Sequence, residues 1–246
     1  MVVRIAGADA RGYLQDMLTN DVATLAPGKP LWAGLLSAQG KPLFDMILHD
    51  DGPAVLLDVA STLAAALVRR LTMYRLRRAV TIEPTAQAVF AAWDEPGDHP
   101  ADPRLAQLGL RWIGGGVPTA SAADYHARRL VFGVPDTDDL LLDRMLWLEA
   151  NAVELNGVSF TKGCYVGQEN TARMHHRDKL RRRLLPVCFD GVAGVGDPVM
   201  AGATVAGELR TSIAGRGIAY LKLELTDGPL TLNGAPLVAE TPDWLR

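Results

Sequence analysis

The segment "SFTKGCYVGQENTARMHHRDKLRRR", residues 159–183, differs in composition from the rest of the chain and decides how the fold is interpreted. It holds Cys164, one of two cysteines in 246 residues, between Gly163 and Gly167. The residues that follow predict a helix over 166–174, so Cys164 lies at or just before its N-terminus. Unpaired N–H groups and the positive end of the helix dipole favour a thiolate there. The segment therefore predicts a functional cysteine rather than a buried structural one.

Cys164 lacks, along the sequence, the companions that chemistry by a single chain requires. Covalent catalysis needs a base within reach, and His175 and His176 are candidates only by proximity along the chain. A zinc site needs about four ligands, and an iron–sulfur cluster needs up to four thiolates. The other cysteine, Cys188, lies in the apolar run "LLPVCF" and is expected in the core. Cys164 can therefore supply one ligand to a cluster shared with a partner.

Length and composition restrict the class of protein. With 246 residues, 48% hydrophobic and 22% charged, the chain can form one large or two smaller globular domains. Two cysteines without a CxxC pair indicate a reducing compartment. No apolar run reaches about 18 residues, so no membrane partner is expected. The N-terminal residues lack the features of a signal or transit peptide, which predicts a cytoplasmic location.

Charge is segregated along the chain although the net charge is only −3. Two basic clusters favour a shared anion-binding surface, and they also leave an RNA-binding module open as a hypothesis. Aromatic residues make up only 6% and are not interleaved with the arginines, so nucleic acid is not expected as a direct partner. The clusters comprise Arg69, Arg70, Arg75, Arg77 and Arg78, and then Arg173, Arg177, Lys179, Arg181, Arg182 and Arg183.

Hydrophobic periodicity predicts an α+β fold with helices on one side of an antiparallel sheet. Strands are expected over 2–5, 31–36, 43–48, 54–59, 80–83 and 89–93. Helices are expected over 10–18 and 122–132, and a further helix is expected to follow Ser61 as its N-cap. Residues 94–103 and 112–118 are predicted loops. From Leu184 onward, short strands separated by glycine, proline and Asn-Gly predict a small β-barrel. The expected domains are therefore 1–183, with a possible subdivision near 94–118, and 184–246.

The longer stretch "NGVSFTKGCYVGQENTARMHHRDKLRRRLLPV", residues 156–187, closely resembles the signature of the YgfZ family of folate-binding proteins. It is most similar to the branch that includes the mitochondrial iron–sulfur assembly factor of eukaryotes. "LQDMLTNDVATL" (14–25) and "LLSAQGKPLFDMIL" (35–48) also match, whereas 94–118 match least. The family shares its fold with the T-protein of the glycine cleavage system. The resemblance therefore implies a ring of α+β subdomains around a folate-sized cavity, followed by a C-terminal barrel.

The resemblance also implies a function. It implies a role in maturing or maintaining iron–sulfur proteins, especially those with [4Fe–4S] clusters, and in bacterial relatives this role reaches enzymes that thiolate tRNA. The expected partners are an A-type carrier protein, [4Fe–4S] client enzymes and tetrahydrofolate or a derivative. Cys164 carries over as the functional thiol that meets a cluster or persulfide. The expected folate-binding residues are Asn20, Asp21, Lys162, Tyr165, Gln168, Glu169 and Arg173.

One position departs from the T-protein pattern. That protein has paired acids in the hairpin that corresponds to "GKPLFDMIL", residues 40–48, whereas here Phe44 replaces the first acid and only Asp45 remains. A carboxylate that would bind or activate the folate amine is thus missing from the sequence pattern. The chain is therefore expected to be an accessory factor rather than a classical enzyme. A tetrahydrofolate-dependent aminomethyl or one-carbon transferase, with Asp45 as its weakly supported catalytic residue, is the alternative.

Overall fold

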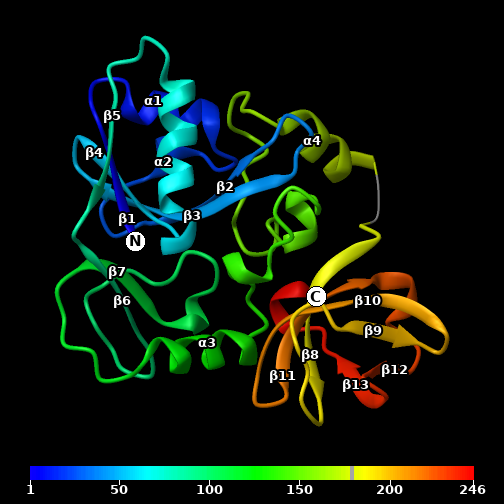
Figure 1. Ribbon diagram of the computed structural model, residues 1–246. Helices are drawn as coiled ribbons and strands as arrows, with labels where there is room; N and C mark the ends of the chain where they lie inside the picture. The colour runs from blue at the N-terminus through cyan, green and yellow to red at the C-terminus, as the bar shows by residue number, and fades with distance from the viewer. Residues whose placement is uncertain (178–179) are drawn as a thin grey trace.

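The protein, described over residues 1–177 and 180–246 by a computed structural model, has three parts arranged side by side (Figure 1). The first is an antiparallel sheet covered by two helices, the second is a β-hairpin with a helix, and the third is a closed β-barrel. The predicted α+β class with a C-terminal barrel is therefore confirmed. None of the described helices combines the length and hydropathy that crossing a bilayer requires. Lys179 of the second basic cluster lies outside the described residues.

The N-terminal sheet has five strands in the order β2-β3-β4-β1-β5, all antiparallel to their neighbours. The short turn of residues 37–41 joins β2 to β3, as the hairpin pattern predicts. The bounds are β1 Val2–Ala6, β2 Leu31–Leu36, β3 Pro42–Asp51, β4 Ala54–Asp58 and β5 Thr81–Thr85, with the helices α1 Ala10–Met17 and α2 Ser61–Arg75 and the 3-10 helix η1 Val22–Thr24.

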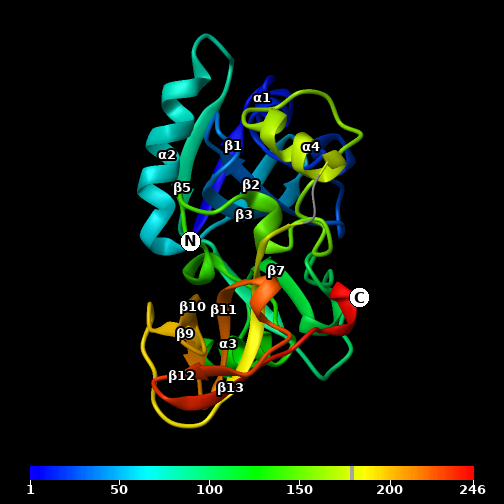
Figure 2. The same cartoon turned by 90° about the vertical axis from the view of Figure 1, so that its right-hand side faces the viewer.

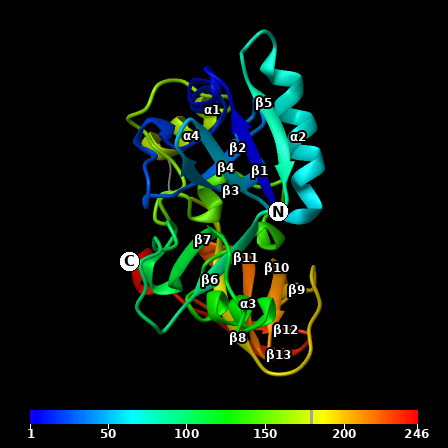
Figure 3. The ribbon, with the colours of Figure 1, turned by 90° about the vertical axis from the view of Figure 1, so that its left-hand side faces the viewer.

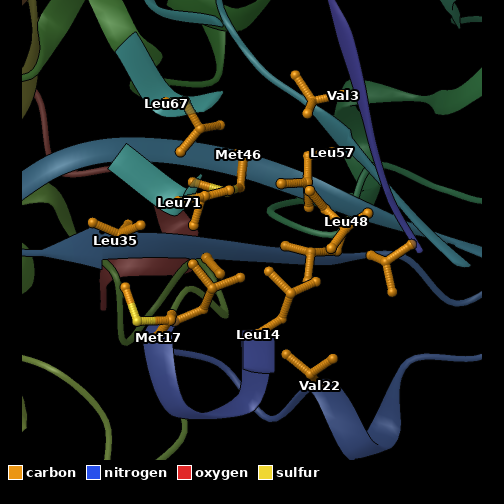
Figure 4. Packing of buried hydrophobic residues seen from close by; sticks show 14 of the residues in the cluster. Val3, Leu14, Met17, Val22, Leu35, Met46, Leu48, Leu57, Leu67 and Leu71 are labelled. Carbon is orange, nitrogen blue, oxygen red and sulfur yellow. The ribbon is translucent and has the colours of Figure 1, made fainter. Parts of the chain in front are cut away.

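Both helices pack on one face of this sheet. Alternate residues of a strand point to opposite faces, so every second residue of β3 faces the helices. Phe44, Met46 and Leu48 of β3 join the apolar core under α1 and α2, where Leu14 and Leu67 meet them (Figure 4). The residues between them on β3 point to the other face. This alternation turns Asp45 away from the helices, and it would bury an acid at position 44 in the helix-side core.

Two local predictions are wrong. Ser61 does not cap α2; it is the first helical residue, and the cap residue Ala60 offers no side-chain acceptor. Residues 112–114 are not a loop, because they belong to β7 (Leu110–Gly114), which pairs with β6 (Ala88–Ala92). The cross-strand stacking of Trp112 on Phe90, with ring centroids 5.6 Å apart, helps to hold this hairpin together.

The hairpin and α3 form the second part, which lies below the sheet and beside the barrel (Figure 3). Ser121 and Asp124 form a capping box at the start of α3. At its other end, buried Arg129 donates to Asp139 at 2.6 Å, and Asp139 also accepts from Thr211 of the barrel. The helices between β5 and β8 are η2 Ala106–Leu108, α3 Ala122–Val131, η3 Thr137–Asp139, η4 Trp147–Ala150 and α4 Gln168–Arg177, of which α4 lies beside the N-terminal sheet (Figure 2).

The barrel closes in the order β10-β11-β8-β13-β12-β9 around its own apolar core. Cys188 does not lie in that core, contrary to prediction; its Sγ is partly exposed and lies 3.1 Å from Oε1 of Glu240. The bounds are β8 Arg182–Phe189, β9 Pro198–Ala201, β10 Thr204–Ile213, β11 Arg216–Lys222, β12 Leu230–Leu232 and β13 Ala235–Ala239, with the 3-10 helices η5 Leu223–Leu225 and η6 Asp243–Leu245.

Candidate functional site

A cavity of about 1130 Å³ lies between the helix-free face of the N-terminal sheet, the β6–β7 hairpin and α3. Its walls combine aromatic rings with carboxylates, which is the composition of a site for a flat, polar ligand. The aromatic lining residues are Trp32, Phe90, Trp93, Trp112 and Tyr125, and the acidic ones are Asp45, Asp58, Glu95, Asp136 and Asp138. No residue of the barrel lines the cavity.

Asp45 is the predicted site residue that the structure places in this cavity. Its side chain is buried and accepts hydrogen bonds from Nε1 of Trp32 at 3.2 Å and from Oγ1 of Thr137 at 2.6 Å. Burial raises the pKa of Asp45 to about 6, and the neighbouring Asp136 carboxylate acts in the same direction. Asp45 can therefore gain or lose a proton near neutral pH, as a general acid or base requires.

A buried network of arginines and carboxylates forms another wall of the cavity. Arg111 is paired with Asp58, with Nη2 2.6 Å from Oδ2, and it also donates to the Tyr125 hydroxyl at 3.0 Å. Arg104 donates to the same hydroxyl at 2.6 Å and pairs with Asp102 at 2.8 Å. Both arginines that line the cavity are therefore neutralised by carboxylates, and the cavity wall is acidic overall.

Two further groups near this network have perturbed pKa values. Against the raising effect of burial, the guanidinium groups of Arg104 and Arg129 hold the pKa of Asp136 at about 2. Burial lowers the pKa of His49 to about 4, and its Nε2 is buried without a hydrogen-bond partner among the described residues. Asp136 is thus ionised and His49 neutral at neutral pH, whereas the raised pKa of Asp45, about 6, lies close to neutral pH.

Cys164 lies elsewhere, on an exposed loop at the β2 edge of the sheet. The preceding Lys162 fixes this loop, because its buried Nζ donates to the carbonyls of Gln15, Leu18 and Asn20 at 2.6, 2.6 and 2.9 Å. These carbonyls include ones left open at the C-terminal end of α1. Burial lowers the pKa of Lys162 to about 8, so the ammonium that supplies three donors persists at neutral pH.

Thr19, Asn20 and Asp21, which follow α1 in the chain, hold the N-terminal end of the same loop. Asn20 donates from Nδ2 to the carbonyls of Trp32 and Asn156, at 2.8 and 2.7 Å. Thr19 donates from Oγ1 to the carbonyl of Gly157 at 2.7 Å. The side chain of Asp21 accepts from Gln15 and from a backbone N–H of η1. These contacts join two segments more than 130 residues apart in sequence and cover the outer edge of β2.

The start of α4 packs on the β2–β3 turn. Gly167 has φ +84°, and a Cβ added there would lie 2.4 Å from the Ser37 carbonyl oxygen, so this close approach requires glycine. Tyr165 is buried, and its backbone N–H donates to Oε1 of Gln168. α4 and α2 lie at opposite sides of the sheet (Figure 2), which separates the two basic clusters.

The structure therefore divides the predicted site residues into two groups. Asp45 lines the cavity, whereas Lys162, Tyr165, Gln168, Asn20 and Asp21 form the base that holds the Cys164 loop. Glu169 and Arg173 are exposed on α4, and the ion pairs of the described residues do not include one between them. No group of three or more His, Cys, Asp or Glu side chains within residues 1–177 and 180–246 is arranged to hold a metal ion. Four lining residues, Asp58, Arg111, Tyr125 and Asp136, escaped the sequence analysis, because no motif or spacing in the chain relates them.

Comparison with solved structures defines the class of fold. The structure superposes on the glycine cleavage system aminomethyltransferase T from Bartonella henselae with a TM-score of 0.77, covering 99% of this chain and 83% of that one. The sequences are only 13% identical, so this likeness shows the fold alone. Residues 181–246 match the family model of the CAF17 C-terminal beta-barrel domain.

Sequence relatives then define the family. The chain is 34% identical to the mitochondrial iron–sulfur cluster assembly factor IBA57 of Mus musculus and to that of Homo sapiens, over 99% of its own length and 82% of theirs. The homologue from Neurospora crassa is 29% identical over 78% of this chain. The chain therefore belongs to the IBA57 family of iron–sulfur cluster assembly factors.

These relatives correct the prediction of a cytoplasmic location, because they are named as mitochondrial proteins. The prediction rested on N-terminal residues without signal- or transit-peptide features and on a low cysteine content, and the cysteine content indicates only reducing surroundings. Such surroundings are not restricted to the cytoplasm, so the cysteine count could not distinguish the two compartments.

Proposed function

We propose that this protein assists the assembly or maintenance of iron–sulfur proteins, especially those with [4Fe–4S] clusters, and that it binds a reduced folate in the central cavity. In this proposal Cys164 meets a cluster or a persulfide that a partner carries. Membership of the IBA57 family supports the assembly role. The observation that carries the role of the cysteine is its exposure on a loop whose backbone is fixed by buried hydrogen bonds.

The surroundings of Cys164 favour a ligand or thiol shared with another molecule. None of the hydrogen bonds among the described residues involves its Sγ, and Gly163 beside it has open space where a side chain would be. His175, one of the bases suggested by sequence, instead stacks on Phe160 with ring centroids 3.7 Å apart. A thiol without a base beside it is better suited to complete a site on an A-type carrier or a [4Fe–4S] client enzyme than to act as a nucleophile.

The cavity residues fit the ring system of a reduced folate. Pockets for small molecules have volumes of about 300–1000 Å³, and this cavity is at least that large. The amino and N–H groups of the folate ring can donate hydrogen bonds to the carboxylates of Asp45 and Asp58. Trp112 and Phe90 offer aromatic faces on which the ring can stack. The glutamate tail has no unpaired cation among the described lining residues, so we expect it to extend toward solvent.

The role of the cysteine is tested by a pair of matched variants. Cells that lack this protein are supplied with wild type, Cys164→Ser or Cys188→Ser, and the activity of a [4Fe–4S] enzyme is measured. We expect Cys164→Ser to lose the support and Cys188→Ser to keep it, because Cys188 already lies beside Glu240 on the barrel. Full support by Cys164→Ser would remove the thiol from the mechanism.

A second measurement distinguishes the role of the Cys164 thiol from folate binding. The purified protein is mixed with a cluster-loaded A-type carrier, and the visible absorption spectrum is compared between wild type and Cys164→Ser. A change in the spectrum that depends on Cys164 supports a shared ligand. Binding of tetrahydrofolate, measured separately by fluorescence of the cavity tryptophans, should be unaffected by Cys164→Ser, because Cys164 does not line the cavity.

The alternative function is a tetrahydrofolate-dependent aminomethyl or one-carbon transferase. Asp45 favours it, because a buried carboxyl with a pKa of about 6 on the cavity wall is suited to proton transfer. Incubation with tetrahydrofolate and an aminomethyl or methyl donor should then show turnover that Asp45→Asn abolishes. Absence of turnover with every donor would leave the accessory role alone.

A further inference from the structure

A second pocket, of about 520 Å³, lies between the barrel and the segment of residues 141–149. Among the described residues it shares no lining residue with the central cavity, and none of the functions described above uses it. Its volume is within the range of about 300–1000 Å³ that small-molecule sites occupy. The lining residues are Lys41, Leu141, Arg144, Leu146, Glu149, Arg182, Val205, Gly207, Glu208, Tyr220 and Lys222.

Four cationic side chains reach this pocket from four separate segments. Lys41 comes from the β2–β3 turn, Arg144 from the segment before η4, Arg182 from the start of β8 and Lys222 from the end of β11. Nothing in the sequence brings them together, because they are up to 181 positions apart. Cations from distant segments that converge on one concave surface are typical of an anion-binding site rather than of a solvated charged face.

These cations keep hydrogen-bond donors free for a ligand. Lys41 donates once to the Asp143 carbonyl, at 2.8 Å, and Lys222 donates once to the Val205 carbonyl, at 2.9 Å. An ammonium group has three donors, so two remain on each lysine. The Arg182 guanidinium lies 5.5 Å from the centre of the Tyr220 ring, and the side chain of Arg144 is 68% exposed. Such groups bind phosphate or carboxylate oxygens through charge-assisted hydrogen bonds.

Two carboxylates face the same pocket, and both are already engaged. Glu149 accepts from the Tyr220 hydroxyl and from the Leu146 N–H, each at 2.7 Å. Glu208 accepts from Arg210 at 3.0 Å and lies 3.8 Å from Arg144. Because four cations outnumber two acids among the lining residues, the pocket carries a net charge of +2 when all six are ionised.

The barrel wall of this pocket is irregular where β9, β10 and β11 meet. The register of β10 against β9 shifts between Val205 and Gly207, so the strand pairing is irregular at the pocket wall. At Gly207 the backbone lies so close to β11 that an added Cβ would be 2.0 Å from the Tyr220 carbonyl oxygen. Glycine at this position therefore lets β10 and β11 approach closely where Gly207 and Tyr220 line the pocket.

We propose that this pocket binds a small molecule that carries two or more phosphate or carboxylate groups. The four cations supply the charge and the donors, and Tyr220 with Glu149 supplies a buried polar floor that can orient the ligand. The site is separate from the central cavity and from Cys164, so the anion-binding proposal can be tested independently of the proposed assembly role.

The test is calorimetric titration of the full-length protein at low ionic strength with two probes, pyrophosphate and tricarballylate. Three variants are compared with wild type: Arg144→Gln/Arg182→Gln, Glu208→Gln, and the control Arg69→Gln/Arg77→Gln. The control removes the same charge from exposed arginines of α2 and of the segment just after it, far from the pocket. Circular dichroism checks that every variant is folded.

We expect wild type to bind at least one probe, and the preferred probe identifies phosphate or carboxylate as the ligand group. The pocket double variant should bind it about tenfold or more weakly, because it loses two charge-assisted contacts. Glu208→Gln should bind it several-fold more tightly, because a repelling carboxylate is removed while an acceptor for Arg210 remains. Failure of wild type to bind either probe, or equal weakening in the α2 control, would overturn the proposal.

Discussion

Replacement of Asp45 by asparagine should make the protein more stable at neutral pH. The Asp45 carboxyl is buried, and its pKa is raised from the ordinary value of 3.8 to about 6. Each tenfold change in proton affinity corresponds to about 1.36 kcal/mol. The ionised form of Asp45 therefore costs the folded state about 3 kcal/mol relative to its cost in the unfolded chain. Asparagine avoids this cost but loses about 1 kcal/mol, because it cannot accept from both Trp32 and Thr137 as the carboxylate does.

The pH dependence gives this prediction its sign. Between about pH 4 and pH 6 the Asp45 carboxyl is protonated in the folded protein but ionised in the unfolded chain. The folded state then binds more protons, so the stability that protonated Asp45 contributes is lost as the pH rises through about 6. The free energy of unfolding of Asp45→Asn minus that of wild type should therefore increase by about 2 kcal/mol from about pH 4 to about pH 7. At neutral pH the variant should be more stable by about 2 kcal/mol.

Urea unfolding followed by tryptophan fluorescence measures this difference at a series of pH values. The comparison must be between variant and wild type, because His49 changes the stability in the opposite direction over an overlapping pH range. A difference that stays constant between about pH 4 and pH 7 would refute the reasoning. It would mean that water in the cavity solvates the carboxylate and that its pKa is ordinary.

Three further predictions concern other positions in the fold. The free energy of unfolding of His49→Gln should rise by about 3 kcal/mol relative to that of wild type as the pH falls from about 6.5 to about 4. The reason is that folded His49 stays neutral while the same residue in the unfolded chain binds a proton, and urea unfolding measures the difference. Gly167→Ala should lower stability by about 3 kcal/mol through its positive φ and its contact with a backbone oxygen, whereas the matched Gly163→Ala should change it by less than about 0.5 kcal/mol in thermal unfolding. Asp139→Asn should lower the free energy of unfolding by about 3 kcal/mol, since it removes the carboxylate that accepts from the buried Arg129 guanidinium at 2.6 Å and leaves Arg129 only the more distant Asp136, at 3.9 Å; an unchanged midpoint of denaturant unfolding would contradict this.

The sequence predicts the N-terminal sheet well, because each strand carries its own signal. The hairpin of β2 and β3 follows from two apolar runs around a glycine-containing turn, and the barrel follows from short strands separated by glycine and Asn-Gly. Local signals do not reveal the cavity wall. Arg111 is paired with Asp58, 53 positions away, and no spacing rule relates them. The wall exists only after the β6–β7 hairpin folds against the sheet, in the region where the resemblance is weakest.

The same limit applies to the residues around Cys164, for which folate binding stays a prediction. Lys162 precedes the cysteine by two positions, and the sequence offers no sign that its ammonium is already used. Lys162 instead donates to carbonyls at the end of α1, more than 140 positions earlier in the chain. The position of Phe44, in contrast, can be predicted from the sequence. The period of a β-strand places it on the helix side of β3, so its replacement of an acid removes nothing from the cavity.

The cysteine loop and the cavity are separate surfaces of one hydrogen-bonded unit. Asp45 accepts from the Trp32 indole at 3.2 Å, Asn20 donates to the Trp32 carbonyl at 2.8 Å, and Lys162 donates to the Asn20 carbonyl at 2.9 Å. A ligand in the cavity therefore need not touch Cys164 to influence it. Any molecule that binds the folded sheet stabilises every contact that depends on that sheet, including those that hold the thiol loop. A bound folate would then act on the cysteine by keeping its supporting loop in place rather than by reacting with the thiol.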